Sequence, residues 1–279
     1  MPDVNDTKNM RAGLTRNESI LLSTLSEKGR TIFSLKDIVD ELDCSYDYAK
    51  VLANNLTKER WSTALRRGTS LIVPLSAGVK PSYTEHEFVI ASHLVSLYYI
   101  AYWSALNFHG FTEQTPFTVF VATTKRTKSR KTFSVNYRFV TLNKRKFFGF
   151  VPTAIGTSKV NISNPEKTLA DALDHPEYCG GITEVAKSLW NAREKLSMNI
   201  ILDYAGKMGN SAIIKRLGFL VESLGVEVKA KTILTMEESI SSGTSALDPT
   251  RPRMGKHSTK WNLLVNISKE ALEEGRRGY

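Results

Sequence analysis

Polar and aromatic side chains recur at helical spacing in the short segment that follows Ser45. Tyr46, Lys50 and Asn54 lie four residues apart, so a helix would stack them on one face, and Tyr48 lies near its N-terminal end. The amide of an asparagine can read an adenine edge through two hydrogen bonds. We therefore assign Ser45, Tyr46, Tyr48, Lys50 and Asn54 to a candidate DNA-binding helix.

Two adjacent arginines, Arg66 and Arg67, lie just before Gly68. Residues 62–65 on one side and 70–74 on the other have the composition of strands, which predicts a hairpin with a glycine-containing turn. Arginines at the tip of such a wing can contact phosphates or enter a minor groove. Both arginines therefore join the candidate DNA-binding set.

Three short helices have to position these side chains. A capping box at Thr15–Glu18 predicts the start of the first helix, and Gly29 is placed to end it. Ser34 and Ser45 are N-cap residues for the second and third helices, which a tight turn separates. This geometry is typical of a helix that enters the major groove, so residues 1–80 are predicted to form a winged helix-turn-helix DNA-binding domain.

The same architecture also serves as a protein-docking module, and the charge of this segment leaves that alternative open. Residues 1–80 contain 12 basic and 10 acidic residues, which is close to neutral and argues against strong non-specific DNA binding.

The net charge of +10, from 38 basic and 28 acidic residues, is concentrated elsewhere. Between Gln114 and Pro165 the chain has ten basic residues and no acidic one, which indicates either a solvated surface or a face that touches nucleic acid. The candidate residues of this second nucleic-acid face are Lys125, Arg126, Lys128, Arg130, Lys131, Lys144, Arg145 and Lys146.

A linker at 74–83 separates this first domain from residues 81–279, which we expect to form a larger mixed domain. The predicted fold class is α+β: an N-terminal winged helix-turn-helix followed by a mixed α/β domain. Residues 98–110 are rich in aromatics at helical spacing and end at Gly110, where His109 is expected to be a structural hydrogen-bonding residue. Further expected elements are helices at 88–97, from Asn164, at 200–222 and at 270–279, and strand-like segments at 118–122, 132–135, 137–140, 147–162, 226–230 and 261–265.

Several functional classes are disfavoured by what the sequence lacks. No apolar stretch approaches the ~20 residues of a membrane span and no signal peptide is evident, so we expect a cytoplasmic protein with no membrane partner. Cys44 and Cys179 belong to no zinc-type or disulfide pattern, and we expect both to be reduced and partly buried. No phosphate-binding glycine loop, zinc-protease or serine-hydrolase motif occurs, so we expect no enzyme activity, cofactor or metal.

One enzymatic alternative remains. Asp203 and the triplet Glu227-Val228-Lys229 have the residue types of a metal-dependent nuclease, in which carboxylates hold Mg²⁺ and a lysine assists the attacking water. The pattern is common on exposed strands and Asp203 falls in a predicted helix, so this reading ranks last.

Two longer blocks resemble the AbiEi-type antitoxin family: Tyr99–Gln114 (YIAYWSALNFHGFTEQ) and Ile162–Gly181 (ISNPEKTLADALDHPEYCGG). The similarity continues through Arg216–Leu220 and Leu247–Pro249, and with the N-terminal domain it covers most of the chain. Within the second block, a capped helix explains every residue of the run Asn164–Thr168 except Lys167, so we assign no catalytic role to that run.

The resemblance implies a regulator that represses its own operon through the N-terminal domain and acts as the antitoxin of a type IV toxin-antitoxin system. Its DNA partner would be an operator in its own promoter, with inverted repeats. Its functional partner would be a nucleotidyltransferase-like toxin, with no stable complex required, and RNA is a further candidate partner. The main alternative is a ligand-responsive winged-helix transcription factor without a toxin partner.

Overall fold

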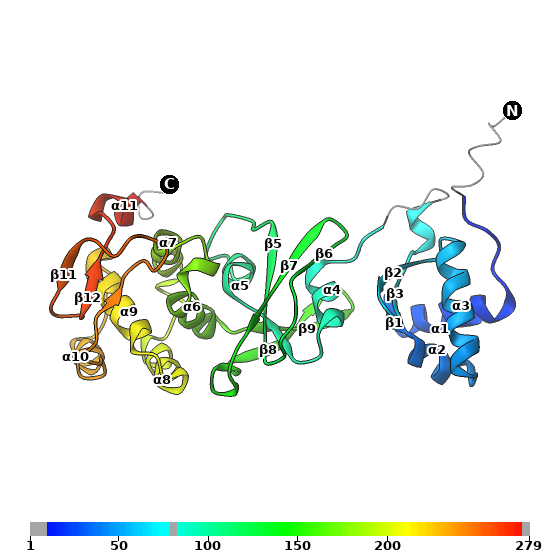
Figure 1. Cartoon of the computed structure of the whole chain (residues 1–279), viewed down its shortest axis with the longest axis horizontal. Helices are drawn as coiled ribbons and strands as arrows, with labels where there is room; N and C mark the ends of the chain where they lie inside the picture. Colours follow the sequence, from blue (N-terminus) through cyan, green and yellow to red (C-terminus); the bar gives the residue numbers. More distant parts are fainter. Residues whose placement is uncertain (1–9, 79–82, 275–279) are drawn as a thin grey trace, which may run out of the picture. The chain divides into compact units, whose positions relative to one another are not determined.

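The structure, a computed structural model, describes residues 10–78 and 83–274. Within them the chain is α+β and divides into two compact units. The first unit is drawn from Met1–Ser96, Thr132–Ser134 and Ala154–Val160, and the second from Leu97–Lys131, Val135–Thr153 and Asn161–Tyr279. Figure 1 labels most of the helices and strands of both.

Helix caps set the beginnings of the first three helices, as the sequence predicts. Thr15 and Glu18 form a capping box at the start of α1, and Ser34 and Asp37 form another at α2. At α3 the hydroxyl of Ser45 accepts a hydrogen bond from a backbone N–H. The elements of this part of the chain are α1 (Arg16–Glu27), β1 (Ile32–Ser34), α2 (Leu35–Leu42), α3 (Tyr46–Lys58), β2 (Ser62–Arg66), β3 (Thr69–Ile72), η2 (Leu75–Ala77) and α4 (Glu87–Leu94).

A small apolar core holds the three helices against a three-stranded antiparallel sheet of order β1-β3-β2. Every helix contributes to it: the buried side chains are Leu21, Leu25, Phe33, Ile38, Ala49, Leu52 and Leu56. Three helices followed by a β-hairpin is the arrangement of a winged helix-turn-helix (Figure 1, blue).

The hairpin turn that forms the wing is anchored to α2. Gly68 has a φ of +71°, which a residue with a side chain adopts only under strain, and its carbonyl accepts a hydrogen bond from the Leu35 N–H at 3.0 Å. A β-bulge between Ala64 and Arg66 precedes the turn. The backbone that presents Arg66 and Arg67 is therefore fixed at both the strand and the turn.

A six-stranded mixed sheet lies at the centre of the following region, with strand order β6-β7-β5-β4-β9-β8. Strand β5 runs parallel to β7, whereas β4 is antiparallel to β5 and parallel to β9. The bounds are β4 (Tyr98–Ile100), β5 (Thr118–Thr123), β6 (Arg130–Thr132), β7 (Val135–Thr141), β8 (Phe150–Ile155) and β9 (Ser158–Ser163), with α5 (Tyr102–Phe108) after β4 and η3 (Lys144–Lys146) after β7.

Helices and a second, small sheet complete the chain. Asn164 caps α6 and Pro165 is its first residue, as predicted. The remaining elements are α6 (Pro165–Asp174), η4 (Pro176–Tyr178), α7 (Ile182–Ala192), α8 (Met198–Met208), α9 (Ser211–Leu224), α10 (Ala230–Glu238), β10 (Ser245–Ala246), β11 (Lys256–Ser258), β12 (Leu263–Val265) and α11 (Lys269–Glu274). The last part of the helix expected at 270–279 lies outside the described residues.

Three local predictions are wrong. The aromatic segment 98–110 is not one helical run, because Tyr98–Ile100 forms the buried strand β4 and only Tyr102–Phe108 is helical. Residues 132–135 are not one strand, since Phe133 and Ser134 have positive φ and form the turn between β6 and β7. Residues 226–230 form no strand: they lead from α9 into α10.

Both cysteines are free thiols, and Cys44 is partly buried, as expected, whereas Cys179 is fully buried rather than partly buried. Burial raises the pKa of the Cys179 thiol well above its usual value. None of the helices in the described ranges is long and apolar enough to span a membrane.

Candidate nucleic-acid interface

An open groove of about 800 Å³ lies between α3 and the wing. Five of the seven predicted DNA-binding residues line it: Tyr46, Lys50 and Asn54 from α3, with Arg66 and Arg67 from the wing. All five side chains are exposed. The groove therefore combines an aromatic ring, an amide and three cations on a surface that a ligand can reach.

Among the described residues, Lys50 is the one groove cation that has a protein counter-charge. Its ammonium lies 2.9 Å from a carboxylate oxygen of Asp47 and 4.9 Å from the ring centroid of Tyr46. The hydrogen bond and the charge of Lys50 lower the pKa of the Asp47 carboxyl. Both partners are exposed, and ion pairs of this kind are weak because water screens them, so a phosphate can displace the carboxylate.

Asn54, Arg66 and Arg67 have no hydrogen bond or ion pair from their side chains to the described part of the chain. An asparagine amide in this state offers a donor and an acceptor together, which is the pattern that an adenine edge requires. The two guanidiniums carry an uncompensated charge of +2 at the wing. The groove therefore offers two unpaired guanidiniums and one unpaired amide to a ligand.

The other two predicted residues have different positions. Tyr48 faces α1, where its phenol oxygen accepts a hydrogen bond from Nδ2 of Asn17 at 2.9 Å, and it lines a separate hollow with Val51 and Asn55. The hydroxyl of Ser45 is occupied as the N-cap of α3, accepting from the Tyr48 backbone N–H at 3.2 Å. Neither side chain lines the groove.

Three hydroxyl-bearing residues of the groove were not predicted from the sequence. Ser34, Thr57 and Ser70 line the groove beside the predicted residues. The spacing of Lys50, Asn54 and Thr57 continues the same helical stripe, so the periodicity could have identified Thr57. The sequence identifies Ser34 only as a cap, and Ser70 has no local signal because the place of its strand, β3, beside the groove depends on the folded structure.

The basic residues between Gln114 and Pro165 do not share one kind of environment. Lys125, Arg126 and Lys128 lie in the loop between β5 and β6, Arg130 and Lys131 on β6 are exposed, and so is Lys144 at the start of η3. Arg130 and Lys131 line an open hollow of about 560 Å³ together with Arg138, whose guanidinium lies 4.6 Å from the ring centroid of Tyr178.

Two of the predicted basic residues are held by protein groups. Arg145 donates to the carbonyl oxygens of Lys207 at 2.7 Å and Gly206 at 3.3 Å, so its charge faces the C-terminus of α8. Lys146 pairs at 2.6 Å with Asp174, whose side chain is buried. Both cations therefore stabilise the fold locally.

Lys167, which helix capping alone did not explain, is fully buried. Its ammonium contacts the carboxylate of Asp171 one turn along α6, and donates to the phenol oxygen of Tyr99 at 2.9 Å. The Tyr99 hydroxyl in turn donates to Asp171 at 3.0 Å. Burial raises the pKa of the Asp171 carboxyl, and the charge of Lys167 opposes that shift. This closed triad satisfies its own charges.

His109 is also structural, as predicted. Its Nε2 lies 2.7 Å from the carbonyl oxygen of Ser163, and burial lowers its pKa.

The nuclease alternative gains no support from geometry. Asp203 lies on α8, whereas Glu227 and Lys229 lie in the connection before α10, which is not a strand. No group of three or more metal-binding side chains is found among the described residues.

Comparison of the sequence with protein-family models and with curated proteins gives no match. Among solved structures, the fold is similar to that of the Rv2827c protein from Mycobacterium tuberculosis, known from a crystal structure, with a TM-score of 0.68. The two chains are 13% identical, and the match covers 96% of this chain and 97% of that one. The chain therefore shares the fold of Rv2827c over nearly its whole length.

Proposed function

We propose that this protein binds operator DNA through the groove between α3 and the wing. The observation that carries the proposal is the convergence of Tyr46, Lys50, Asn54, Arg66 and Arg67 on that one groove. In this mode α3 enters the major groove, Asn54 reads a base edge, and the two arginines bind phosphates or the adjacent minor groove.

The biological role that fits this binding is transcriptional autorepression by the antitoxin of a type IV toxin-antitoxin operon. Its support is the resemblance of Tyr99–Gln114 and Ile162–Gly181 to AbiEi-type antitoxins. A winged helix at the N-terminus agrees with this resemblance, which implies repression through the N-terminal domain. The toxin would be nucleotidyltransferase-like. The second unit would oppose its effect, with RNA as a candidate partner for the exposed cations of residues 125–144.

DNA binding is tested by a mobility-shift titration on the DNA upstream of the protein's own gene and on random DNA, at two salt concentrations. We expect wild type to prefer its own upstream DNA, and the variant Lys50→Ala/Asn54→Ala to lose that preference. Equal binding of wild type to both DNAs would reject the operator assignment and favour a protein-docking role for the winged helix.

The antitoxin role has a separate test. Co-expression with a neighbouring nucleotidyltransferase-like reading frame should restore growth that the toxin alone arrests, and the second unit should be required for the rescue. The absence of such a reading frame from the operon, or arrest that co-expression leaves unchanged, would favour the ligand-responsive transcription factor.

A further inference from the structure

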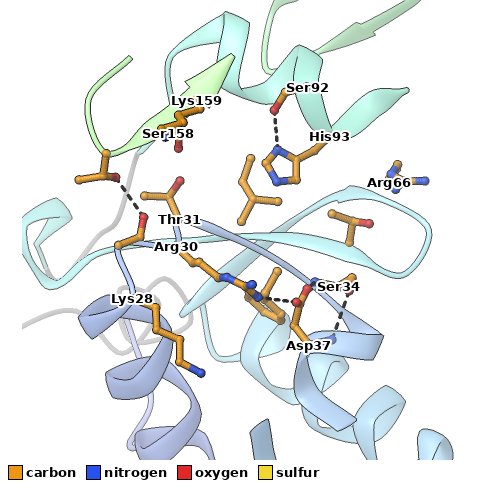
Figure 2. Close-up of a pocket in the computed structure, with 15 residues that line it drawn as sticks. Lys28, Arg30, Thr31, Ser34, Asp37, Arg66, Ser92, His93, Ser158 and Lys159 are labelled. Carbon is orange, nitrogen blue, oxygen red and sulfur yellow. Dashed lines mark hydrogen bonds and ion pairs between the residues drawn. The ribbon is translucent and has the colours of Figure 1, made fainter. Parts of the chain in front are cut away.

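A further hollow, of about 450 Å³, lies behind the wing and within the first unit. Its walls come from the end of α1, the first strand, the start of α2, the wing, α4 and the turn between β8 and β9 (Figure 2). That turn is held against the winged helix by a hydrogen bond from the Thr157 hydroxyl to the Gly29 carbonyl oxygen at 3.0 Å. The volume is within the range of small-molecule sites.

The lining of this hollow is strongly cationic. Four of the lining residues are basic (Lys28, Arg30, Arg66 and Lys159) and one, Asp37, is acidic. Arg30 is paired with Asp37 at 2.6 Å, and Lys28 is paired with a glutamate outside the hollow. Arg66 and Lys159 have no counter-charge in the described residues.

Neutral hydrogen-bonding groups accompany these cations. Ser92 and Ser158 line the hollow, and Figure 2 shows the His93 ring projecting from α4 into it. The Nδ1 atom of His93 lies 3.0 Å from the Val89 carbonyl oxygen and 2.9 Å from the Ser92 hydroxyl, which leaves Nε2 toward a ligand. Cations with hydroxyl groups around a site of this size suit a small anion with several charged oxygens.

We propose that this hollow binds a phosphate-bearing small molecule with two or three phosphate groups, and that the ligand and DNA compete for Arg66. The two unpaired cations, Arg66 and Lys159, lie on opposite sides of the hollow (Figure 2), so a chain of two or three phosphates suits them better than a single phosphate or carboxylate. Arg66, Ser34 and Phe33 line both this hollow and the DNA groove. A ligand that holds the Arg66 guanidinium therefore withdraws a cation from the groove.

The competition rests on the proposed DNA binding, but ligand binding itself does not. By linkage, a ligand that lowers the affinity for DNA is itself bound less tightly, by the same factor, when DNA is bound. Lys159 lines the hollow and not the groove, so its removal separates the two events.

The first experiment is calorimetry of the DNA-free protein with sodium tripolyphosphate at fixed ionic strength set by sodium chloride. We expect one saturable site, a loss of about ten-fold in affinity for Lys159→Ala, and unchanged affinity for Lys231→Ala. Lys231 is an exposed lysine on α10, so the control removes the same charge elsewhere. No saturable binding, or equal effects of the two variants, would overturn the proposed site.

The second experiment adds tripolyphosphate to the mobility-shift titration at the same ionic strength. At a tripolyphosphate concentration about three times its dissociation constant for wild type, we expect the dissociation constant for upstream DNA to rise several-fold for wild type and to change less than two-fold for Lys159→Ala. An unchanged constant for wild type that binds tripolyphosphate would overturn the competition through Arg66. Failure of wild type to bind its upstream DNA would instead reject the proposed function, since calorimetry tests the site on its own.

Discussion

The phenol oxygen of Tyr48 accepts a hydrogen bond from Nδ2 of Asn17 at 2.9 Å, which ties the N-terminal turn of α3 to α1. Tyr46, two residues earlier, is 55% exposed over the groove and has Lys50 above its ring. One helix turn therefore presents two tyrosines with different roles. Tyr48 is held against α1, whereas Tyr46 is exposed in the groove that we propose binds DNA.

Replacing each tyrosine separates these roles. Tyr46→Ala should weaken binding to upstream DNA by about five-fold, because it removes an aromatic contact worth about 1 kcal/mol. Tyr48→Ala should change DNA affinity less than two-fold and lower the midpoint of thermal unfolding slightly. Mobility shift and thermal unfolding measure the two effects. Equal losses of DNA affinity would place both rings on the DNA.

The adjacent asparagines of α3 offer a second matched pair. Asn54 lines the groove, whereas Asn55 lines the hollow on the α1 side of the helix. Asn54→Ala should reduce the preference for upstream over random DNA by about ten-fold, as expected from the loss of about 1–3 kcal/mol of base discrimination. Asn55→Ala should leave the preference intact. Competition binding with random DNA measures it, and a loss for Asn55→Ala would mean that α3 docks on a different face.

Local signals were sufficient to predict the winged helix, because its helix starts depend on residues three apart. Thr15 with Glu18 and Ser34 with Asp37 are visible in any reading of the chain, and the Gly68 turn marks the hairpin. Strand β4 had no comparable signal. Tyr98, Tyr99 and Ile100 are all buried between β5 and β9, so they show no alternation that would distinguish a strand from a helix.

Side-chain contacts between residues far apart in the sequence could not be predicted. Arg145 contacts carbonyls of α8 that lie 61 and 62 residues away, and Lys146 pairs with Asp174, 28 residues away. The density of basic residues identifies the positively charged segment between Gln114 and Pro165. Only the fold decides which of its cations are held by other groups of the protein. The same holds for Lys159, whose place in the hollow behind the wing depends on the turn between β8 and β9.

The wing should contribute affinity with little sequence preference. Arg66→Ala/Arg67→Ala removes two phosphate contacts, so the slope of log affinity against log salt should become shallower by about two, while the ratio of upstream to random DNA changes little. Lys229→Ala/Lys231→Ala removes two exposed charges outside the groove and should leave the slope unchanged. Mobility shifts at four salt concentrations give the slopes. A shift in the preference ratio without a change in slope would indicate base contacts by the wing.

The buried triad of the second unit should dominate its stability. Lys167→Met and Asp171→Leu each leave an unpaired partner in a fully buried position, so each should lower the free energy of unfolding by about 3–5 kcal/mol. The double variant should cost less than the sum of the two, because no buried charge remains. Urea unfolding of the full chain measures these differences. Additive losses would show that the two residues act independently, against their contact in the structure.

His109 should make stability depend on pH in a defined direction. Burial lowers the pKa of its imidazole below the usual 6.5, although the contact with the Ser163 carbonyl opposes this shift. The unfolded chain therefore binds a proton more readily, so the contribution of His109 is fully present above about pH 6.5 and is lost as pH falls through the folded pKa. Urea unfolding of wild type and His109→Gln between pH 5 and 8 should show wild type losing stability relative to the variant toward pH 5. A difference that stays constant over this range, or grows toward acid, would mean that folding does not favour the neutral ring.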